Sequence, residues 1–299
     1  MRWLLLLALL LPGPVLAETL PAFRVTPAGR EAPASLLIPS SHQPEPGLLP
    51  PAPEAFEGRA ALLLESVEDA EDVGDLLRAP PGFAVLDPFP PAERRLLEAA
   101  IACTRLVPEP LSPLGLFLAL LAATQPPAAP CPGLPAPPAT PEGAPAAGGD
   151  PALRELARRR GLPIQGLETR REMLLAVRGM GGDAVLRLVS LMARQMRQGD
   201  PVLEVRMAQA LLAGDFDRLR AQLLAPMAAE PGLAQAFARQ MLDGRNAVMA
   251  RRLAQRLPRE SLVIAIGAAH AAGPSGVPAL LRRAGFRVEA VRIPAAPLE

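Results

Sequence analysis

Short apolar runs near both ends of the chain, separated by a long stretch of helical periodicity, limit the fold more than any other feature of the sequence. The runs are bounded by turn residues and have the length of strands rather than of helices. Strands are therefore expected at 23–26, 35–38, 60–64, 162–167, 261–266 and 286–293. Helices are expected at 91–105, 112–124, 169–178, 182–197, 201–212, 215–224, 231–240, 242–257 and 275–284.

Strands and helices that alternate at both ends of a chain are typical of an α/β fold. We predict a central mixed sheet with flanking helices and an all-helical insertion at about 170–257 in the middle of the chain. Asp150 is expected to cap a further helix that begins at Pro151 and ends at Gly161. Residues 125–149 are almost entirely Pro, Ala and Gly, so we expect a flexible loop within a single domain, 18–299.

The first 17 residues have the pattern of a signal peptide. Arg2 precedes an apolar run from Trp3 to Leu11, and a small-residue cleavage site ends at Ala17. The run is shorter than the roughly 20 residues that a membrane-spanning helix needs. We expect cleavage near Ala17 and a periplasmic or secreted protein without a stable membrane span, with a retained N-terminal anchor as the alternative.

The composition excludes one class of partner and singles out a few residues. With 31 basic and 30 acidic residues, a formal net charge of +1 and 3% aromatic residues, we expect no nucleic-acid binding. For the two cysteines, Cys103 and Cys131, a disulfide and two free thiols are both open. His42 and His270 are the only histidines and Asn246 is the only asparagine, and such rare residue types are informative where they persist.

Four candidate ligands lie at the ends of predicted strands: His42, Glu65, Glu168 and His270. Ligands of open α/β sheets bind at the carboxyl ends of the strands, so these side chains are expected to converge. Two imidazoles and one or two carboxylates suit a divalent ion such as zinc, manganese or cobalt, and a second carboxylate can act as a general base. Gly267, three residues before His270, allows a tight turn and a close approach of the backbone to a ligand.

Each of these residues also has a structural interpretation. A histidine that follows a strand often belongs to a turn or to the surface, and Glu65 can be a solvated strand end. Glu168 precedes Thr169 at a strand-to-helix junction, where a carboxylate favours the helix dipole. Arg245 is unremarkable inside a helix, whereas its neighbour Asn246 is a mediocre helix former and is less easily dismissed.

Several of these segments together resemble the TraB/PrgY/GumN family, which is related to Tiki-type metalloproteases. The C-terminal Gly-x-x-His segment is 267–270, the middle Gly-Leu-Glu-Thr segment is 166–169, and the Arg-Asn pair is 245–246. The first Gly-x-x-His segment of the family corresponds to 39–42, where Pro39 replaces the glycine. Met173 also stands where the family pattern has glutamine. The resemblance spans roughly 23–293.

The resemblance implies a metal-dependent, peptidase-like hydrolase that acts on a peptide or protein. It implies that His42, Glu65 and His270 are metal ligands or bases, and that Glu168, Arg245 and Asn246 position the substrate or polarise its carbonyl, with Gly267 and Thr169 as supporting motif residues. Two other interpretations stay open: a catalytically inactive member that binds a peptide or glycan in envelope or exopolysaccharide functions, and a purely structural envelope protein. Pro39 lacks a backbone N–H and has a restricted φ, which is the sequence feature that favours an inactive member. The oligomeric state is left open.

Overall fold

The computed structural model describes residues 18–29, 34–42, 48–67, 71–104, 110–124, 132–134, 149–198 and 201–298. The predicted signal peptide, Cys131 and most of the Pro/Ala/Gly-rich segment 125–149 lie outside these residues. Cys103 is disulfide-bonded. No helix within the described ranges is long and apolar enough to cross a membrane.

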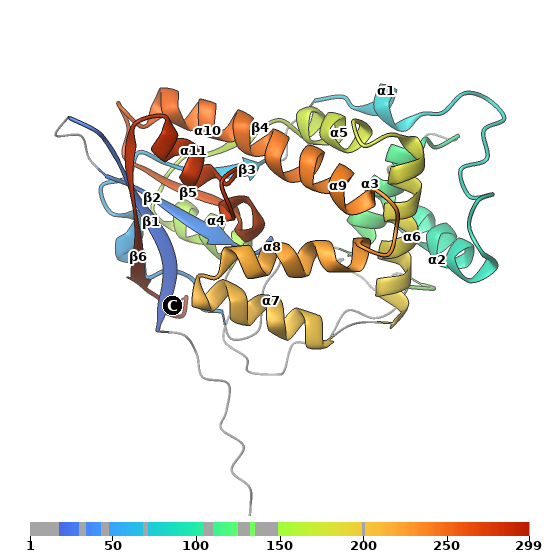
Figure 1. Cartoon of the computed structure of the whole chain (residues 1–299), viewed down its shortest axis with the longest axis horizontal. Helices are drawn as coiled ribbons and strands as arrows, with labels where there is room; N and C mark the ends of the chain where they lie inside the picture. The colour runs from blue at the N-terminus through green and yellow to red at the C-terminus, as the bar shows by residue number, and fades with distance from the viewer. Residues whose placement is uncertain are drawn as a thin grey trace, which may run out of the picture.

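A six-stranded mixed sheet, counted over the described residues, occupies one side of the molecule (Figure 1). Its strands are β1 (Thr19–Pro27), β2 (Ser35–Ser40), β3 (Ala61–Ser66), β4 (Ile164–Glu168), β5 (Leu262–Gly267) and β6 (Phe286–Pro294), in the order β4-β3-β5-β2-β1-β6. The pairs β2–β5, β3–β5 and β3–β4 are parallel, and β1 is antiparallel to both neighbours. The carboxyl ends of β4, β3, β5 and β2 therefore meet at one edge of the sheet.

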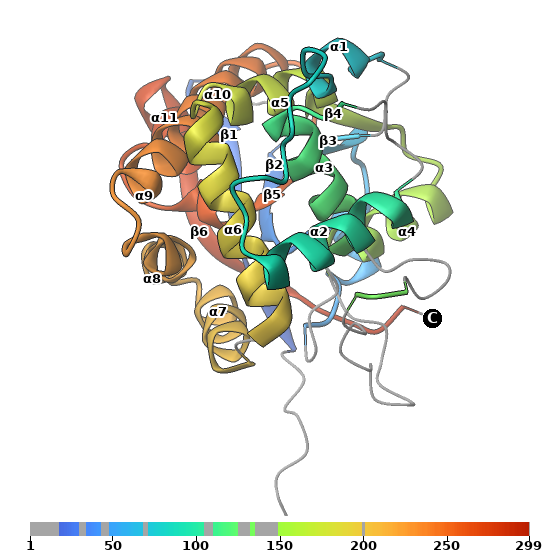
Figure 2. The same ribbon diagram turned by 90° about the vertical axis from the view of Figure 1, so that its right-hand side faces the viewer.

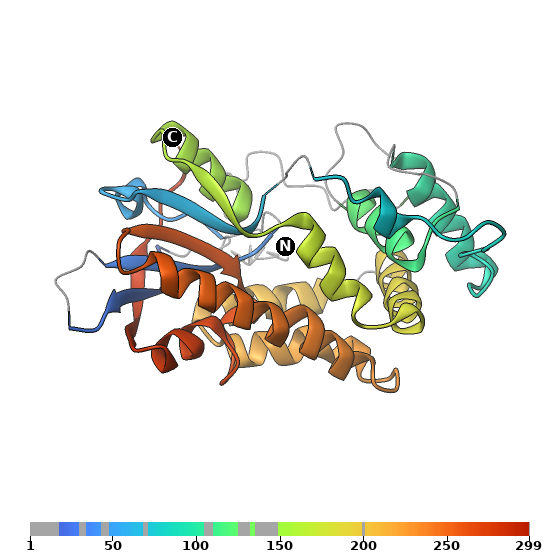
Figure 3. The same cartoon turned by 90° about the horizontal axis from the view of Figure 1, so that it is seen from above.

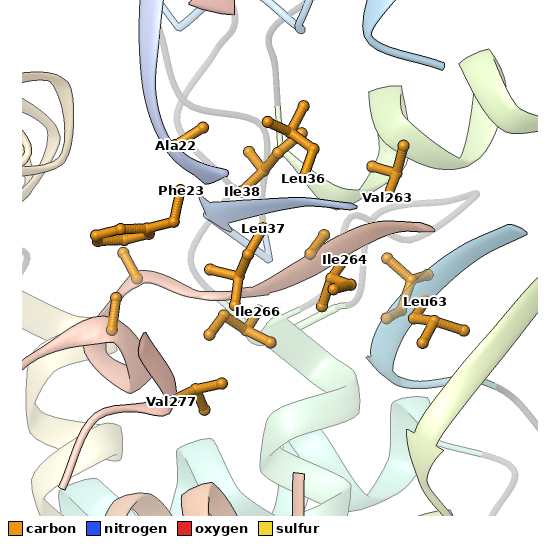
Figure 4. Close-up of a cluster of buried hydrophobic side chains, with 14 of the residues drawn as sticks. Ala22, Phe23, Leu36, Leu37, Ile38, Leu63, Val263, Ile264, Ile266 and Val277 are labelled. Atoms are coloured by element: carbon orange, nitrogen blue, oxygen red, sulfur yellow. The ribbon is translucent and has the colours of Figure 1, made fainter. Parts of the chain in front are cut away.

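The central strands are apolar because both of their faces are covered, as is usual for parallel strands. Every residue of β2 and β5 is buried, as are the first five residues of β3. Figure 4 shows the alternation: Leu37, Ile264 and Ile266 lie on one side of the sheet, and Leu36, Ile38 and Val263 lie on the other.

Helices surround the sheet and form a second body beside it. They are α1 (Gly74–Leu77), α2 (Pro91–Cys103), α3 (Pro113–Thr124), α4 (Asp150–Arg159), α5 (Arg170–Arg178), α6 (Gly182–Gln198), α7 (Pro201–Ala213), α8 (Phe216–Leu224), α9 (Leu233–Phe237), α10 (Arg245–Arg256) and α11 (Val277–Arg283). Short 3-10 helices span Pro53–Phe56, Ala225–Met227 and Ala268–Ala271, and a π-helix spans Ala238–Gly244.

The buried apolar residues form two clusters, which correspond to the two sides of the molecule. One cluster joins the sheet to α4, α7, α8, α10 and α11, and the other joins α1, α2, α3, α5 and α6. Figures 1 and 3 show α2, α3 and α6 on the right and the sheet on the left, and Figure 2 views the molecule from the side of α2 and α6. The predicted α/β class and the predicted helical region in the middle of the chain are both confirmed.

Two local predictions were wrong. Gly149, not Asp150, occupies the N-cap position of α4, where its φ of 106° suits glycine, and Asp150 is the first helical residue. The helices expected at 231–240 and 242–257 are not separate, because the π-helix Ala238–Gly244 connects α9 directly to α10. Four short elements were not predicted: α1 and the 3-10 helices Pro53–Phe56, Ala225–Met227 and Ala268–Ala271.

Candidate functional site

The shared edge of the four parallel strands brings together the polar residues that follow them. Glu65 lies near the end of β3, and Glu168 is the last residue of β4. His42 follows β2 by two residues, and His270 lies in the 3-10 helix that continues from β5. Arg245 enters the same space from the first residue of α10.

Glu65 is at the centre of this group. Its Oε1 atom lies 3.4 Å from His270 Nε2 and 3.7 Å from His42 Nε2, and it accepts a hydrogen bond from the backbone N–H of Gly267. Its Oε2 atom accepts from Arg245 Nη2 at 2.7 Å. One carboxylate therefore contacts both histidines, the end of β5 and the guanidinium.

Arg245 connects the two carboxylates. Its Nε atom donates to Glu168 at 2.8 Å (Oε1) and 3.1 Å (Oε2), and its Nη2 atom contacts both Glu168 and Glu65. The three side chains are 2%, 6% and 11% exposed for Glu168, Glu65 and Arg245, so this bridge is almost fully removed from water. Arg245 Nη1 also lies 3.4 Å from His270 Nε2, so the guanidinium faces the same space as the imidazole.

Both histidines are oriented through their Nδ1 atoms. Asn246 donates from Nδ2 to the carbonyl of Ser275 at 2.8 Å, which leaves its Oδ1 atom to accept from His270 Nδ1 at 2.6 Å. His42 Nδ1 lies 2.9 Å from Asp150 Oδ2, which accepts its proton. With Nδ1 as the donor in each ring, both Nε2 atoms face Glu65.

Gly267 leaves the space in which His42 and Glu65 approach each other. A Cβ atom at this position would lie 2.9 Å from Glu65 Oε1 and 2.9 Å from His42 Nε2, closer than such contacts occur. The backbone does not require glycine here, because φ is −53° and ψ is 135°. The absence of a side chain at 267 is therefore explained by the site and not by the turn.

Solvent reaches the site at His42. Its side chain is 56% exposed, whereas the side chains of Glu65 and His270 are 6% and 4% exposed. Of these three side chains, His42 is therefore the one that a substrate or ion can contact directly from solvent.

The surroundings of the two histidines and the two glutamates shift their pKa values in different directions. The charge of Glu65, with the hydrogen bond to Asp150, raises the pKa of His42 to about 9, whereas burial lowers the pKa of His270 to about 4. Burial alone would raise the pKa of Glu65, but His270, His42 and Arg245 together hold it well below its usual range. Burial and the nearby charge of Glu65 raise the pKa of Glu168 in spite of its bonds to Arg245.

Acidification is expected to weaken the metal-free protein through His270. The unfolded chain binds a proton below the ordinary pKa of 6.5, whereas the folded protein binds it only near pH 4. The free energy of unfolding therefore falls as the pH falls through this window, by at most about 1.4 kcal/mol per pH unit. His270→Gln removes this contribution, so the stability difference between wild type and variant should narrow on acidification in urea unfolding with a chelator present. A difference that stays constant across the window would contradict the buried, neutral imidazole.

The raised pKa of His42 has the opposite sign. Its contribution to stability is complete below 6.5 and is lost as the pH rises through about 9. The two histidines therefore affect stability in separate pH windows.

The structure brings together every residue predicted for the site except Thr169. The Thr169 hydroxyl accepts from Glu172 N–H at 3.2 Å and forms a capping box at the start of α5, so its contacts are those of a helix cap. Glu168 does not serve that helix as the structural interpretation proposes, because Arg245 binds both of its oxygens. Pro39 does not displace His42: it pairs with Ile266 inside the buried strand β2.

The sequence predictions missed the role of Asp150, which was interpreted only as a helix cap. Its Oδ1 atom accepts from Ser40 Oγ at 2.5 Å, while Oδ2 contacts His42. No local pattern indicates this contact, because 108 positions separate Asp150 from His42.

The described residues contain no group of three or more His, Cys, Asp and Glu side chains in the arrangement of a metal centre. In comparisons with known proteins, the model of the TraB/PrgY/gumN family matches residues 35–290, which is most of the chain. No curated protein and no solved structure matches the chain.

Proposed function

The chain belongs to the TraB/PrgY/gumN family, and on this basis we propose that it is an exported, metal-dependent hydrolase that cleaves peptide bonds at the cluster of His42, Glu65 and His270. One observation carries the proposal: both imidazole Nε2 atoms face the same oxygen of Glu65, at 3.4 and 3.7 Å. Export is proposed from the sequence of residues 1–17 alone.

The residues fit a divalent ion by donor type. Two imidazole nitrogens and a carboxylate oxygen are the ligands that catalytic zinc uses, and bonds of about 2.0–2.1 Å in tetrahedral geometry place ligand atoms roughly 3.3 Å apart. The separation between Glu65 and His270 is close to this value, and that between Glu65 and the exposed His42 is slightly longer. The space left by Gly267 lies between His42 and Glu65.

The second contact of each histidine supports the same interpretation. Metal-binding histidines usually donate their other ring N–H to a carboxylate or carbonyl oxygen, which fixes the tautomer. Here Asn246 and Asp150 accept from the Nδ1 atoms. A neutral His270 then directs a lone pair toward the negative charge of Glu65, an arrangement that a cation between them would stabilise.

Different environments suit the two carboxylates to different roles. Glu65 is held in its charged form, which favours binding of a cation. The raised pKa of Glu168 makes it the better proton acceptor of the two carboxylates, which suits it to the role of general base. Arg245 is held by both carboxylates and presents Nη1 beside His270, where it can stabilise negative charge on a carbonyl oxygen. When bound, the metal ion would supply Lewis-acid polarisation of the scissile carbonyl.

Metal analysis tests the proposal directly. The purified protein, exposed separately to Zn²⁺, Mn²⁺ and Co²⁺ and then dialysed, is expected to retain one equivalent of at least one ion. His270→Ala and Glu65→Ala are expected to lose it, because each removes a proposed ligand. Glu172→Ala is the control, since Glu172 pairs with Arg252 at the protein surface.

If wild type and His270→Ala both retain negligible metal, the proposed metal site is contradicted. Cleavage of a peptide library by the metal-loaded protein, lost in the same two variants, would support hydrolysis. Retained metal without any cleavage would favour a binding protein instead.

A further inference from the structure

We propose that Asp150 is a positioning residue for His42 and holds its imidazole with Nε2 directed at Glu65. Asp150 contacts Ser40, the last residue of β2, and the two residues that follow it, Ser41 and His42. Its carboxylate accepts from Ser40 Oγ at 2.5 Å and from His42 Nδ1 at 2.9 Å, and its backbone N–H donates to the Ser41 carbonyl at 2.9 Å. These three contacts tie the turn that presents His42 to the start of α4.

The carboxylate is itself held firmly. The side chain of Asp150 is 16% exposed, and Ser40, which is buried, donates to the oxygen that His42 does not use. Helix α4 buries Ala152, Leu153, Leu156 and Ala157 and packs against β3 and the 3-10 helix Pro53–Phe56. The Asp150 carboxylate is therefore held in place by its own contacts and can orient the exposed side chain of His42.

His42 needs such a fixed partner more than His270 does. His270 is 3% exposed and its partner Asn246 is completely buried, so the surrounding atoms already restrict that ring. The side chain of His42 is more than half exposed, and without the bond to Asp150 it would be free to rotate toward solvent. The conformational entropy of this exposed side chain is then lost on folding and not on ligand binding, which is the usual effect of preorganisation.

The arrangement also gives the two rings the same orientation toward Glu65. In each, Nδ1 donates to a side-chain oxygen and Nε2 faces Glu65 Oε1. One acceptor, Asn246, directly follows Arg245 on α10. The other, Asp150, directly follows the Pro/Ala/Gly-rich segment 125–149 in the sequence. The role rests on the proposed function only where it concerns metal affinity, because the orientation of the ring is a property of the metal-free protein.

Nuclear magnetic resonance of the imidazoles tests the proposal, because the chain has only two histidines. Protein labelled with ¹⁵N-histidine and made without a histidine tag is expected to show two hydrogen-bonded Nδ1–H protons without added metal. Asp150→Ala should lose the signal of His42 and keep that of His270. Asp150→Asn, which retains the shape and an oxygen acceptor, should restore it at least in part.

Asp183→Ala is the matched control, because Asp183 is an exposed acidic residue in the first turn of α6. It tests the general effect of removing a carboxylate from a helix start, and it should leave both signals unchanged. Retention of both Nδ1–H signals in Asp150→Ala, or loss of the His42 signal in Asp183→Ala as well, would overturn the proposal.

Zn²⁺ affinity separates this proposal from the proposed function. Asp150→Ala is expected to bind Zn²⁺ about 10- to 100-fold more weakly than wild type, the usual loss for a residue that orients a ligand. A wild-type protein that binds no Zn²⁺ but shows the Asp150-dependent His42 signal would contradict the metal site and support the positioning role. Normal Zn²⁺ affinity in Asp150→Ala would contradict the positioning role and leave the metal site standing.

Discussion

Arg245→Met is expected to lower the free energy of unfolding by about 3–5 kcal/mol, the typical cost of removing one partner from a buried charged network. The substitution keeps most of the side-chain volume but leaves Glu65 and Glu168 without their shared cation. Both carboxylates are at most 6% exposed, so water cannot replace the lost bonds. Urea unfolding of the metal-free proteins measures the effect.

Arg252→Met is the matched control for this prediction. Arg252 lies on the same helix, pairs with Glu172 and donates to the Leu167 carbonyl, but the side chains of the ion pair are 35% and 39% exposed. Exposed ion pairs contribute about 0–1 kcal/mol and a hydrogen bond about 0.5–1.5 kcal/mol, so this variant should lose clearly less stability than Arg245→Met. Equal losses in the two variants would show that the buried bridge contributes no more than a surface pair.

The pH dependence of the same two variants provides a second check. Without Arg245, the pKa of Glu168, which burial already raises, should rise further, and the lowered pKa of Glu65 should move up toward its ordinary value. A carboxyl group with a raised folded pKa is protonated more readily in the folded state, so its unfavourable effect disappears as the pH falls. The stability difference between wild type and Arg245→Met should therefore shrink on acidification, whereas that of Arg252→Met should stay small throughout.

Gly267→Ala is expected to weaken Zn²⁺ binding by about 10- to 100-fold while the protein remains folded, the usual loss when the groups that hold metal ligands in place are disturbed. The added methyl group would lie 2.9 Å from both Glu65 Oε1 and His42 Nε2 and would push them apart. The backbone angles at 267 are ordinary for alanine, so the turn itself should tolerate the change. Calorimetric titration with Zn²⁺ and circular dichroism measure the two properties separately.

Gly182→Ala is the corresponding control. A Cβ atom at 182 would meet only Pro113 Cγ at 3.8 Å, an ordinary contact that involves no residue of the site. This variant should bind Zn²⁺ as wild type does. Wild-type affinity in Gly267→Ala would mean that the space beside Gly267 is not where the ion binds.

The elements of the fold were largely predictable because their signals are local. All six strands lie at the predicted runs, and most helices begin and end within a few residues of their predicted bounds. The predicted strand ends also indicated where the candidate site lies, because the carboxyl ends of parallel strands share one edge of a sheet. The failures were local as well: the π-helix Ala238–Gly244 continues the helix through Asp243-Gly244, a pair that more often marks a turn.

The sequence by itself determined which segments become strands and which polar residues follow them, since hydrophobic periodicity and turn residues act over a few neighbouring positions. Only the tertiary structure decided that both histidines share Glu65, that Arg245 bridges two carboxylates and that Asp150 holds His42. The bonds of Arg245 to Glu65 and of Asp150 to His42 span 180 and 108 positions. These bonds depend on the strand order and on where α4 and α10 pack. Both are set by the burial of apolar faces across the whole chain, so no short stretch of sequence predicts them.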